Sequence, residues 1–251
     1  MNFLGRAKII LGFLLDCLFP RCCVLCNRKT DGDEYCNLCP SCVAKIPWIK
    51  TARCSLCSRP MGDEIESNSS DCALVCNECR DDPPCFSSGM SCWLYSGVGR
   101  DIVLTLKYRN ADFLANDISK LIKNNCQEVC SFAANSVLIP VPLHYFRRVK
   151  RGYNQAELIA HAVAKVADGS RVVNALSGKR KTSQARLKRT ERLVNVKNMF
   201  ECSNATDAIA KDSKIIVVDD VATTGATVRE CCRILRMAGF IDLHVLTLSY
   251  G

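Results

Sequence analysis

The sequence predicts an α/β domain built on a parallel sheet, preceded by a small metal-binding domain. Three observations predict this arrangement. Fourteen of the 19 cysteines lie between Cys17 and Cys92, many of them in spaced pairs, and after Pro83-Pro84 short apolar runs alternate with amphipathic segments of helical length. We therefore expect an N-terminal helix and a cysteine-rich zinc-ribbon domain over residues 1–84, followed by the α/β domain over residues 85–251.

Composition and charge narrow the class of protein further. The chain has 251 residues, of which 48% are apolar and 24% charged, and this excludes a disordered chain. The formal net charge of +9 is uneven, because residues 144–197 hold 14 Lys and Arg against three acids. The apolar segment 9–19 is interrupted by Asp16 and is too short to cross a bilayer, so we expect an amphipathic helix, no stable membrane insertion and a cytoplasmic protein.

The cysteine pairs indicate zinc. Disulfides do not persist in the cytosol, so clustered thiols there are more typical of metal sites, and two Cys-x-x-Cys pairs complete a closed tetrahedral shell. Such a site is structural, and it would supply the folding energy of segments with few apolar residues. The expected ligands of one or two Zn²⁺ ions are Cys23, Cys26, Cys39, Cys42, Cys54, Cys57, Cys76 and Cys79. Cys22, Cys36 and Cys72 also fit the spacing, so an interleaved pairing stays open.

The second domain alternates strands with helices. Apolar periodicity predicts helices over residues 101–108, 112–125, 154–167 and 226–238, and strands over 137–141, 215–218 and 243–248. Asn154 is the expected N-cap of its helix, with Glu157 three residues further on. The run 215–218 is continuously apolar, as expected of a strand buried on both faces of a parallel sheet, where ligands bind at the carboxyl ends of the strands.

An acid pair and a hydroxyl-rich turn follow the strand 215–218. Backbone amides at the start of the next helix, together with threonine hydroxyls, favour phosphate binding. Two adjacent carboxylates repel a phosphate, so we expect them to face ribose hydroxyls or Mg²⁺. The motif Gly-x₄-Gly-Lys-Ser/Thr of P-loop proteins does not occur in the sequence. The predicted ligand-binding residues are Asp219, Asp220, Ala222, Thr223, Thr224, Gly225, Ala226 and Thr227.

This motif resembles the phosphoribosyl-pyrophosphate (PRPP) signature of type I phosphoribosyltransferases, in which the acid pair holds the ribose hydroxyls and the loop surrounds the 5′-phosphate. Four further features, in this order along the chain, make the whole sequence resemble the ComF (ComFC) family of competence proteins. They are the cysteine pairs, the run Ile139-Pro-Val-Pro-Leu143, the run Arg151-Gly-Tyr-Asn-Gln155 and the segment 180–200.

The resemblance implies a type I phosphoribosyltransferase-like, doubly wound parallel sheet. It also implies PRPP with Mg²⁺ as the ligand and a role in DNA uptake during natural transformation. A DNA-uptake protein such as a helicase would be a partner of the zinc ribbon. Residues 140–154 would form the pyrophosphate loop, and residues 178–200 a flexible loop that closes over PRPP.

The basic stretch 144–197 carries more positive charge than PRPP needs. The excess favours single-stranded DNA as a second ligand, because Lys and Arg follow the backbone while aromatic residues stack on bases; a solvated loop is the alternative. The candidates for binding pyrophosphate or DNA are Arg147, Arg148, Lys150, Arg151, Asn154, Gln155, Arg180, Gln184, Arg192 and Asn195. The sequence identifies no general base. It therefore leaves open whether the chain is a ligand-binding protein or an active phosphoribosyltransferase (a pentosyl-transferring enzyme) with a small acceptor.

Overall fold

The computed structural model describes residues 21–30, 34–62, 74–108, 111–143, 149, 151–179 and 199–251. By its contacts the chain divides into two compact units, Met1–Ile46 and Pro47–Gly251, which are described separately. The second group of cysteine pairs belongs to the larger unit, together with the sheet. The domain boundary that composition predicts at residue 84 stays a prediction.

The smaller unit is organised around its cysteines. Its short helix α2 (Pro40–Val43) begins directly after Cys39, and the proline at its first position suits a helix start because that amide has no partner there. Cys23, Cys39 and Cys42 form a small buried cluster, against which Leu25 packs. Among the described residues of this unit, the other buried apolar side chains are Tyr35, Leu38 and Ile46. A core of this size supplies little folding energy, as expected of a domain that metal binding stabilises.

The larger unit holds a five-stranded sheet in which all neighbouring strands are parallel. The strand order is β1-β7-β6-β2-β3. The bounds are Ser88–Leu94 for β1, Val137–Pro140 for β2, Arg171–Val172 for β3, Ile215–Ala222 for β6 and Leu243–Tyr250 for β7. The predicted α/β class with a parallel sheet is confirmed.

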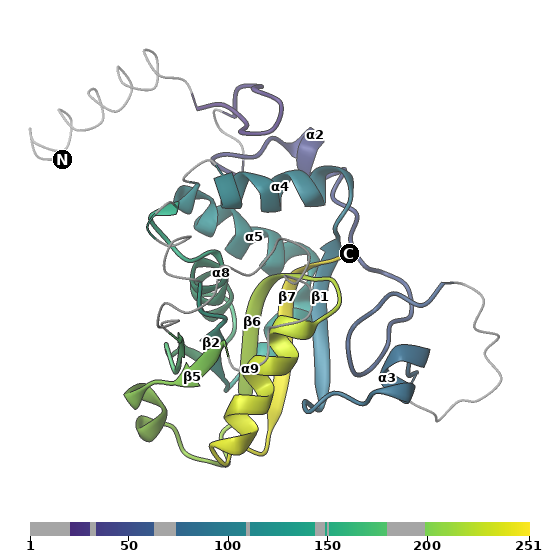
Figure 1. The fold of residues 1–251 in the computed structure, drawn as a ribbon. Helices are drawn as coiled ribbons and strands as arrows, with labels where there is room; N and C mark the ends of the chain where they lie inside the picture. Colours follow the sequence, from purple (N-terminus) through teal and green to yellow (C-terminus); the bar gives the residue numbers. More distant parts are fainter. Residues whose placement is uncertain are drawn as a thin grey trace, which may run out of the picture. The chain divides into compact units, whose positions relative to one another are not determined.

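Helices cover both faces of this sheet. Ile215 and Val217 of β6 belong to the core cluster that includes residues of α9 (Ala226–Met237), which lies along the sheet in Figure 1. Ile216 and Val218 are equally buried but point the other way, because side chains alternate along a strand. That second face is covered by α8 (Gln155–Ala164), which packs on β6 and β2. The sheet is therefore doubly wound, and its strands are apolar on both sides.

The remaining helices lie in the first half of the larger unit. They are α3 (Asn77–Asp81), α4 (Gly97–Tyr108), α5 (Ala115–Asn125), preceded by a 3₁₀ turn (Asp112–Leu114), and α6 (Gln127–Ala133). Asn154 caps α8 as predicted, because its side chain accepts a hydrogen bond from the amide of Ala156 at 3.1 Å. Glu157 instead accepts a hydrogen bond from Asn174 Nδ2 at 2.8 Å.

Three differences from the predicted elements bear on the site. Strand β6 runs on to Ala222, so the acid pair belongs to the strand instead of following it. Strand β1 was not predicted, because Ser88, Gly89 and Ser91 weaken its apolar pattern. A two-stranded antiparallel sheet of β4 (Leu176–Gly178) and β5 (Phe200–Cys202) was also missed; a 3₁₀ turn (Asn204–Ala208) follows it.

Within the part of the chain that the structure describes, the helices are all too short or too polar to cross a membrane. The segment 9–19, predicted to form an amphipathic helix, lies outside the described residues.

Candidate functional site

The eight predicted zinc ligands come together as two clusters in chain order. The first cluster is Cys23, Cys26, Cys39 and Cys42, and the second is Cys54, Cys57, Cys76 and Cys79. The four Sγ atoms of each cluster lie within 4.8 Å of one another, with 3.5 Å between Cys26 and Cys39 and 3.7 Å between Cys57 and Cys76. A tetrahedral centre with Zn–S bonds of about 2.3 Å separates its sulfurs by about 3.8 Å. Both clusters therefore fit structural Zn²⁺ in a closed thiolate shell.

The two clusters are built on the same backbone turn. The amide of Cys23 donates to the carbonyl of Arg28 at 2.7 Å, and the amide of Cys54 donates to the carbonyl of Arg59 at 2.8 Å. Both turns have the sequence Cys-x-Leu-Cys-x-Arg, at residues 23–28 and 54–59. The repeat can therefore be seen in the sequence when these two segments are aligned. Arg28 and Arg59 consequently occupy equivalent positions.

The equivalence extends through the rest of each cluster. The residue after the second cysteine has a positive φ in both turns, 61° at Asn27 and 65° at Ser58. The third cysteine, Cys39 or Cys76, directly precedes a short helix, α2 or α3. The first cysteine turn and the segment from the third cysteine into the short helix are therefore repeated structurally in the second cluster, within the described residues.

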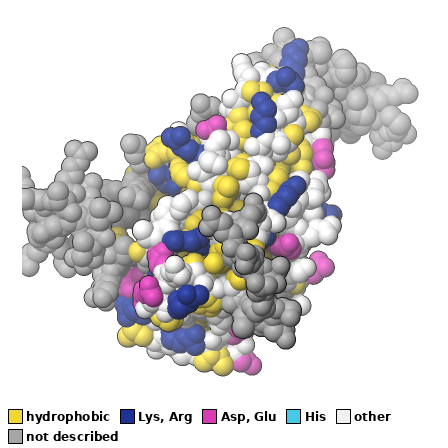
Figure 2. Space-filling model, turned by 90° about the vertical axis from the view of Figure 1, so that its right-hand side faces the viewer, with side chains coloured by type: hydrophobic (Ala, Val, Ile, Leu, Met, Phe, Trp, Pro, Cys, Tyr) yellow, Lys and Arg dark blue, Asp and Glu magenta, His cyan; other side chains and the backbone are white. Residues whose placement is uncertain are grey.

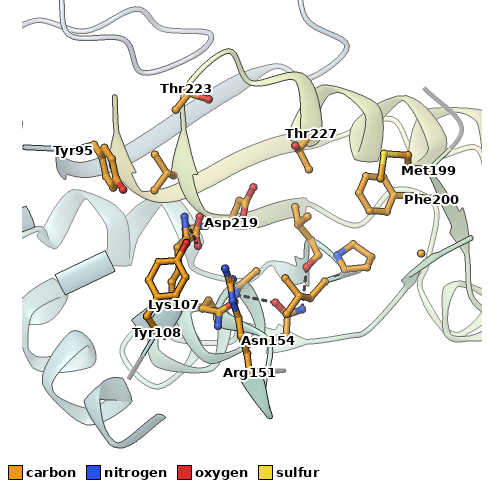
Figure 3. A pocket seen from close by; sticks show the side chains of 18 residues that line it. Tyr95, Lys107, Tyr108, Arg151, Asn154, Met199, Phe200, Asp219, Thr223 and Thr227 are labelled. Carbon is orange, nitrogen blue, oxygen red and sulfur yellow. Dashed lines mark hydrogen bonds and ion pairs between the residues drawn. The ribbon is translucent and has the colours of Figure 1, made fainter. Parts of the chain in front are cut away.

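A cleft of about 910 Å³ opens at the carboxyl ends of β6 and β2 (Figure 3). This is the edge at which ligands bind in open α/β sheets. Four of the eight predicted ligand-binding residues line the cleft, namely Asp219, Asp220, Thr223 and Thr227. They share it with Lys107, Arg151, Asn154 and Gln155, which come from the other side of the strand end.

The acid pair lies in the middle of the cleft. Asp219 Oδ1 accepts a hydrogen bond from the amide of Asp220 at 2.8 Å, and Lys107 Nζ lies 3.1 Å from Asp220 Oδ2. Loss of solvent on burial, and then repulsion from Asp220, raises the pKa of Asp219 from 3.8 to about 7. Hydrogen-bond donors or a cation placed against Asp219 would reverse this rise in pKa. The pair therefore suits a ligand that brings hydroxyl groups or a divalent metal.

Residues 223–227, called the threonine loop below, comprise the turn after β6 and the first two residues of α9. Gly225 has a φ of 67° and caps α9. A Cβ there would meet only Val228, at 3.8 Å, so the glycine is required by the backbone conformation. Thr223 and Thr227 line the cleft, while Thr224 and Gly225 line a small cavity that Thr223 also borders. One side of the threonine loop thus faces the cleft, and the other side faces the small cavity.

Asn154 and Gln155 hold the backbone that forms the opposite wall of the cleft. Asn154 Nδ2 donates to the carbonyl of Val141 at 2.9 Å, and Gln155 Nε2 donates to the carbonyl of Leu106 at 3.2 Å. Both side chains are buried. Tyr153 donates to the same Leu106 carbonyl at 2.5 Å, which fixes the end of α4. Residues 153–155 therefore hold the backbone at Leu106 and Val141 in place, whether or not they also contact a ligand.

Sequence reasoning missed three side chains of the cleft. Lys107 and Tyr108 come from the end of α4, and Tyr95 follows β1. The Arg151 guanidinium carbon lies 5.3 Å from the centre of the Tyr108 ring, a cation–π distance, and in Figure 3 both lie near Lys107. No short spacing links these positions to the acid pair, so only the sheet topology brings them there.

Most of the predicted pyrophosphate or DNA candidates are outside the described residues. Arg151, Asn154 and Gln155 are placed as above. The candidates outside the described residues are Arg147, Arg148, Lys150, Arg180, Gln184, Arg192 and Asn195.

Comparison with known proteins finds a matching zinc-ribbon domain and relatives that are similar over most of the chain. Residues 14–80 match the double zinc ribbon domain, in agreement with the two clusters. The chain is 25% identical over 228 residues to competence protein F of Haemophilus influenzae, covering 84% of this chain and 96% of that protein. The resemblance to the ComF family is confirmed. ComFC of Bacillus subtilis is 27% identical over 227 residues, covering 86% of this chain and 89% of that protein.

A third relative is the DNA utilization protein YhgH of Escherichia coli K12, to which the chain is 25% identical over 230 residues, covering 90% of this chain and 88% of that protein. All three alignments span too much of the chain to be due to the cysteine clusters alone. The similarity to these relatives therefore extends beyond the cysteine clusters into the part of the chain that forms the sheet.

Proposed function

We propose that this chain binds PRPP, or a related phosphorylated ligand, in the cleft and acts on DNA taken up during competence. The observation that carries the proposal is the meeting of the acid pair, two threonines of the loop and the cations Lys107 and Arg151 in one cleft. The printed names of the relatives, two competence proteins and a DNA utilization protein, support the biological role. We propose that it acts in the cytoplasm.

Each group in the cleft has a chemical task in this proposal. Asp219 and Asp220 would accept hydrogen bonds from ribose hydroxyls and hold Mg²⁺, which supplies charge neutralisation to a pyrophosphate group when bound. The hydroxyls of Thr223 and Thr227 would donate hydrogen bonds to the 5′-phosphate, beside the backbone amides at the start of α9. Lys107 lies against Asp220 and offsets part of the charge of the acid pair.

Calorimetry with PRPP and Mg²⁺ tests the proposal directly. The double variant Asp219→Asn and Asp220→Asn should lose binding, because it removes the acceptors for ribose and the ligands of the metal. The matched control is Asp207→Asn with Asp212→Asn, an equal change of charge at two exposed positions. Absence of PRPP binding by the wild-type protein, or equal loss in both double variants, would contradict the proposal.

Single-stranded DNA is the proposed second ligand, bound through the basic stretch 144–197. On the face shown in Figure 2, Lys and Arg of the described residues are scattered among hydrophobic and acidic side chains and form no continuous basic surface. The basic stretch 144–197 is therefore a better candidate for the DNA-binding surface than this face.

Fluorescence anisotropy should detect binding of a labelled oligonucleotide that weakens steeply as salt rises. The variant to test changes Arg147, Arg148, Lys150 and Arg151 to Glu. Its control changes the exposed residues Lys45, Lys50, Arg100 and Lys123 to Glu.

The first variant should lose DNA binding while its zinc content stays unchanged, and the control should keep most of the binding. Unaltered binding in the first variant would exclude a DNA surface there. Adding PRPP with Mg²⁺ to the complex then separates two arrangements. Competition would indicate one shared phosphate site, and independence would indicate two surfaces.

An active phosphoribosyltransferase is the second candidate function. The cleft is large enough to favour it, because about 910 Å³ is at the upper end of small-molecule sites and leaves room for an acceptor beside the phosphoribosyl group. The protein would position both substrates and stabilise the departing pyrophosphate. Release of pyrophosphate from PRPP in the presence of small amines or nucleobases, abolished in the Asp219 and Asp220 double variant, would support it. Tight PRPP binding without release would favour the binding role.

A further inference from the structure

We propose that the second cysteine cluster positions the threonine loop, through Arg59 on one side of the loop and Arg229 on the other. The loop would then take its ligand-binding conformation only when this cluster is intact. The part of the inference that concerns ligand affinity rests on the proposed binding of PRPP, whereas the part that concerns the loop conformation does not.

The first contact reaches the strand before the loop. Arg59 directly follows the turn of Cys54 and Cys57, and its Nε donates to Tyr250 Oη at 3.0 Å. Tyr250 is the last residue of β7 and pairs in the sheet with Ala222, the residue before the loop. The amide of Gly251 donates to the Ala222 carbonyl at 2.8 Å, which closes this end of the strand pair. A displacement of Arg59 would therefore act on the residue from which the loop starts.

The second contact reaches the helix after the loop. Asp82 is the C-cap of α3, three residues after Cys79. Both terminal nitrogens of Arg229, in the first turn of α9, donate to the Asp82 carbonyl at 3.1 Å, and Nη1 also lies 3.2 Å from its carboxylate. A guanidinium bound to two acceptors has a fixed orientation. The start of the loop is thus connected to the second cluster through Tyr250 and Arg59, and its end through Arg229 and Asp82.

Close packing makes this connection rigid. A Cβ on Gly89 of β1 would lie 2.7 Å from the Leu56 carbonyl oxygen and 3.1 Å from the carbonyl carbon of Cys57, so the cysteine turn sits directly on the strand. Cys57 and Cys79 also line the same small cavity as Thr224 and Gly225. Two packed bodies in such contact move together, because protein interiors have little free volume.

The first cluster provides an internal comparison. Arg28 occupies the position of Arg59, and it donates to Ser41 Oγ within its own unit at 2.6 Å. Arg59 contacts the equivalent position of its own cluster, Glu78, and in addition Tyr250. The contact with the sheet is therefore an addition to the repeated motif, instead of a general property of the cysteine turn.

The experiment compares Arg59→Ala and Tyr250→Phe with the matched control Arg28→Ala in the full zinc-loaded chain. Hydrogen exchange of residues 222–229, calorimetric affinity for PRPP with Mg²⁺, and zinc content are measured for each. We expect faster exchange and a Kd about fivefold to tenfold higher for the first two variants at unchanged zinc content. Arg28→Ala should behave as wild type in the first two measurements.

If Arg59→Ala loses zinc or fails to fold, Tyr250→Phe still tests whether the cluster positions the threonine loop. Tyr250→Phe removes only one hydroxyl and leaves the cysteine cluster complete. Wild-type exchange in Tyr250→Phe, or an equal change in Arg28→Ala, would overturn the inference. If the wild-type protein did not bind PRPP, the proposed function would fail, and the exchange measurement would still decide whether the cluster positions the loop.

Discussion

The two cysteine clusters have the same local structure and different surroundings. The first cluster lies in the compact unit Met1–Ile46, whereas the second is part of the unit that holds the sheet and the cleft. Their turns share the hydrogen bond from the first cysteine to the arginine and the positive φ after the second cysteine. Arg28 donates to Ser41 of its own unit, and Arg59 donates to Tyr250 of the sheet. Cysteine spacing therefore encodes a metal centre, while the residues around that centre decide which part of the protein it contacts.

The largest expected effect comes from removing one metal centre at a time. Cys54→Ser with Cys57→Ser should release one zinc equivalent and lower the melting temperature of the larger unit by about 10 °C or more, because structural zinc contributes several kcal/mol of folding energy. Cys23→Ser with Cys26→Ser should also release one equivalent and leave that transition in place. Differential scanning calorimetry and metal analysis measure the melting temperature and the zinc content of both double variants. Equal shifts of the transition would contradict a larger contribution of the second cluster to the stability of the larger unit.

Packing of the second turn against the sheet gives the next largest effect. Gly89→Ala places a methyl group 2.7 Å from the Leu56 carbonyl oxygen, so we expect a destabilisation of about 2–3 kcal/mol. Gly178→Ala, in strand β4, has no described atom within 4 Å of the new Cβ and should change stability by less than about 0.5 kcal/mol. Denaturant unfolding of both variants measures the difference. Similar values would mean that the turn does not press on β1.

The pH dependence of stability distinguishes the unit with the cleft. The pKa of Asp219 is raised to about 7 in the fold, so the folded state holds a proton that the unfolded state has lost above about pH 4. Stability should therefore fall by about 1 kcal/mol as pH rises from 6 to 8. Asp219→Asn should remove this slope and be more stable than wild type at pH 8. Parallel slopes in the two proteins, measured by denaturant unfolding, would contradict the raised pKa.

The smallest effect compares the two residues with positive φ. Ser58 is fully buried, and its hydroxyl has no hydrogen-bond partner among the described residues, whereas Asn27 is exposed. Ser58→Gly relieves both the backbone conformation and the unpaired hydroxyl, so we expect it to stabilise the larger unit by about 1 kcal/mol. Asn27→Gly should be nearly neutral, because asparagine tolerates this conformation. A loss of stability in Ser58→Gly would indicate that the hydroxyl has a partner in solution.

Much of the site follows from patterns that are local in the sequence. The Cys-x-x-Cys spacing predicted both metal clusters, and the acid pair followed by a threonine-rich turn predicted one wall of the cleft. The apolar run 215–218 predicted a strand buried on both faces, and the Asn154 cap was predicted from its helix. These features depend on contacts between residues a few positions apart, where residue type and spacing decide the geometry.

Other features depend on where distant segments meet. Lys107 is over a hundred residues from Asp220 in the chain, yet its ammonium lies 3.1 Å from that carboxylate. Strand β1 was missed because its own pattern is weak, and it is held in the sheet by its pairing with β7. Gln155 was predicted as a ligand-binding residue, and the structure also gives its side chain a hydrogen bond to the Leu106 carbonyl.

Spacing along the chain was enough to predict eight thiols as zinc ligands, and an acid pair before a threonine-rich turn as a ligand-binding site. The fold adds that Arg59, beside the second cluster, lies 3.0 Å from Tyr250, the residue of β7 that pairs with Ala222 at the start of the threonine loop. The two differ because the spacing of cysteine ligands depends only on residues a few positions apart in the chain. The contact between Arg59 and Tyr250 spans 191 positions and exists only because β7 ends beside the second turn.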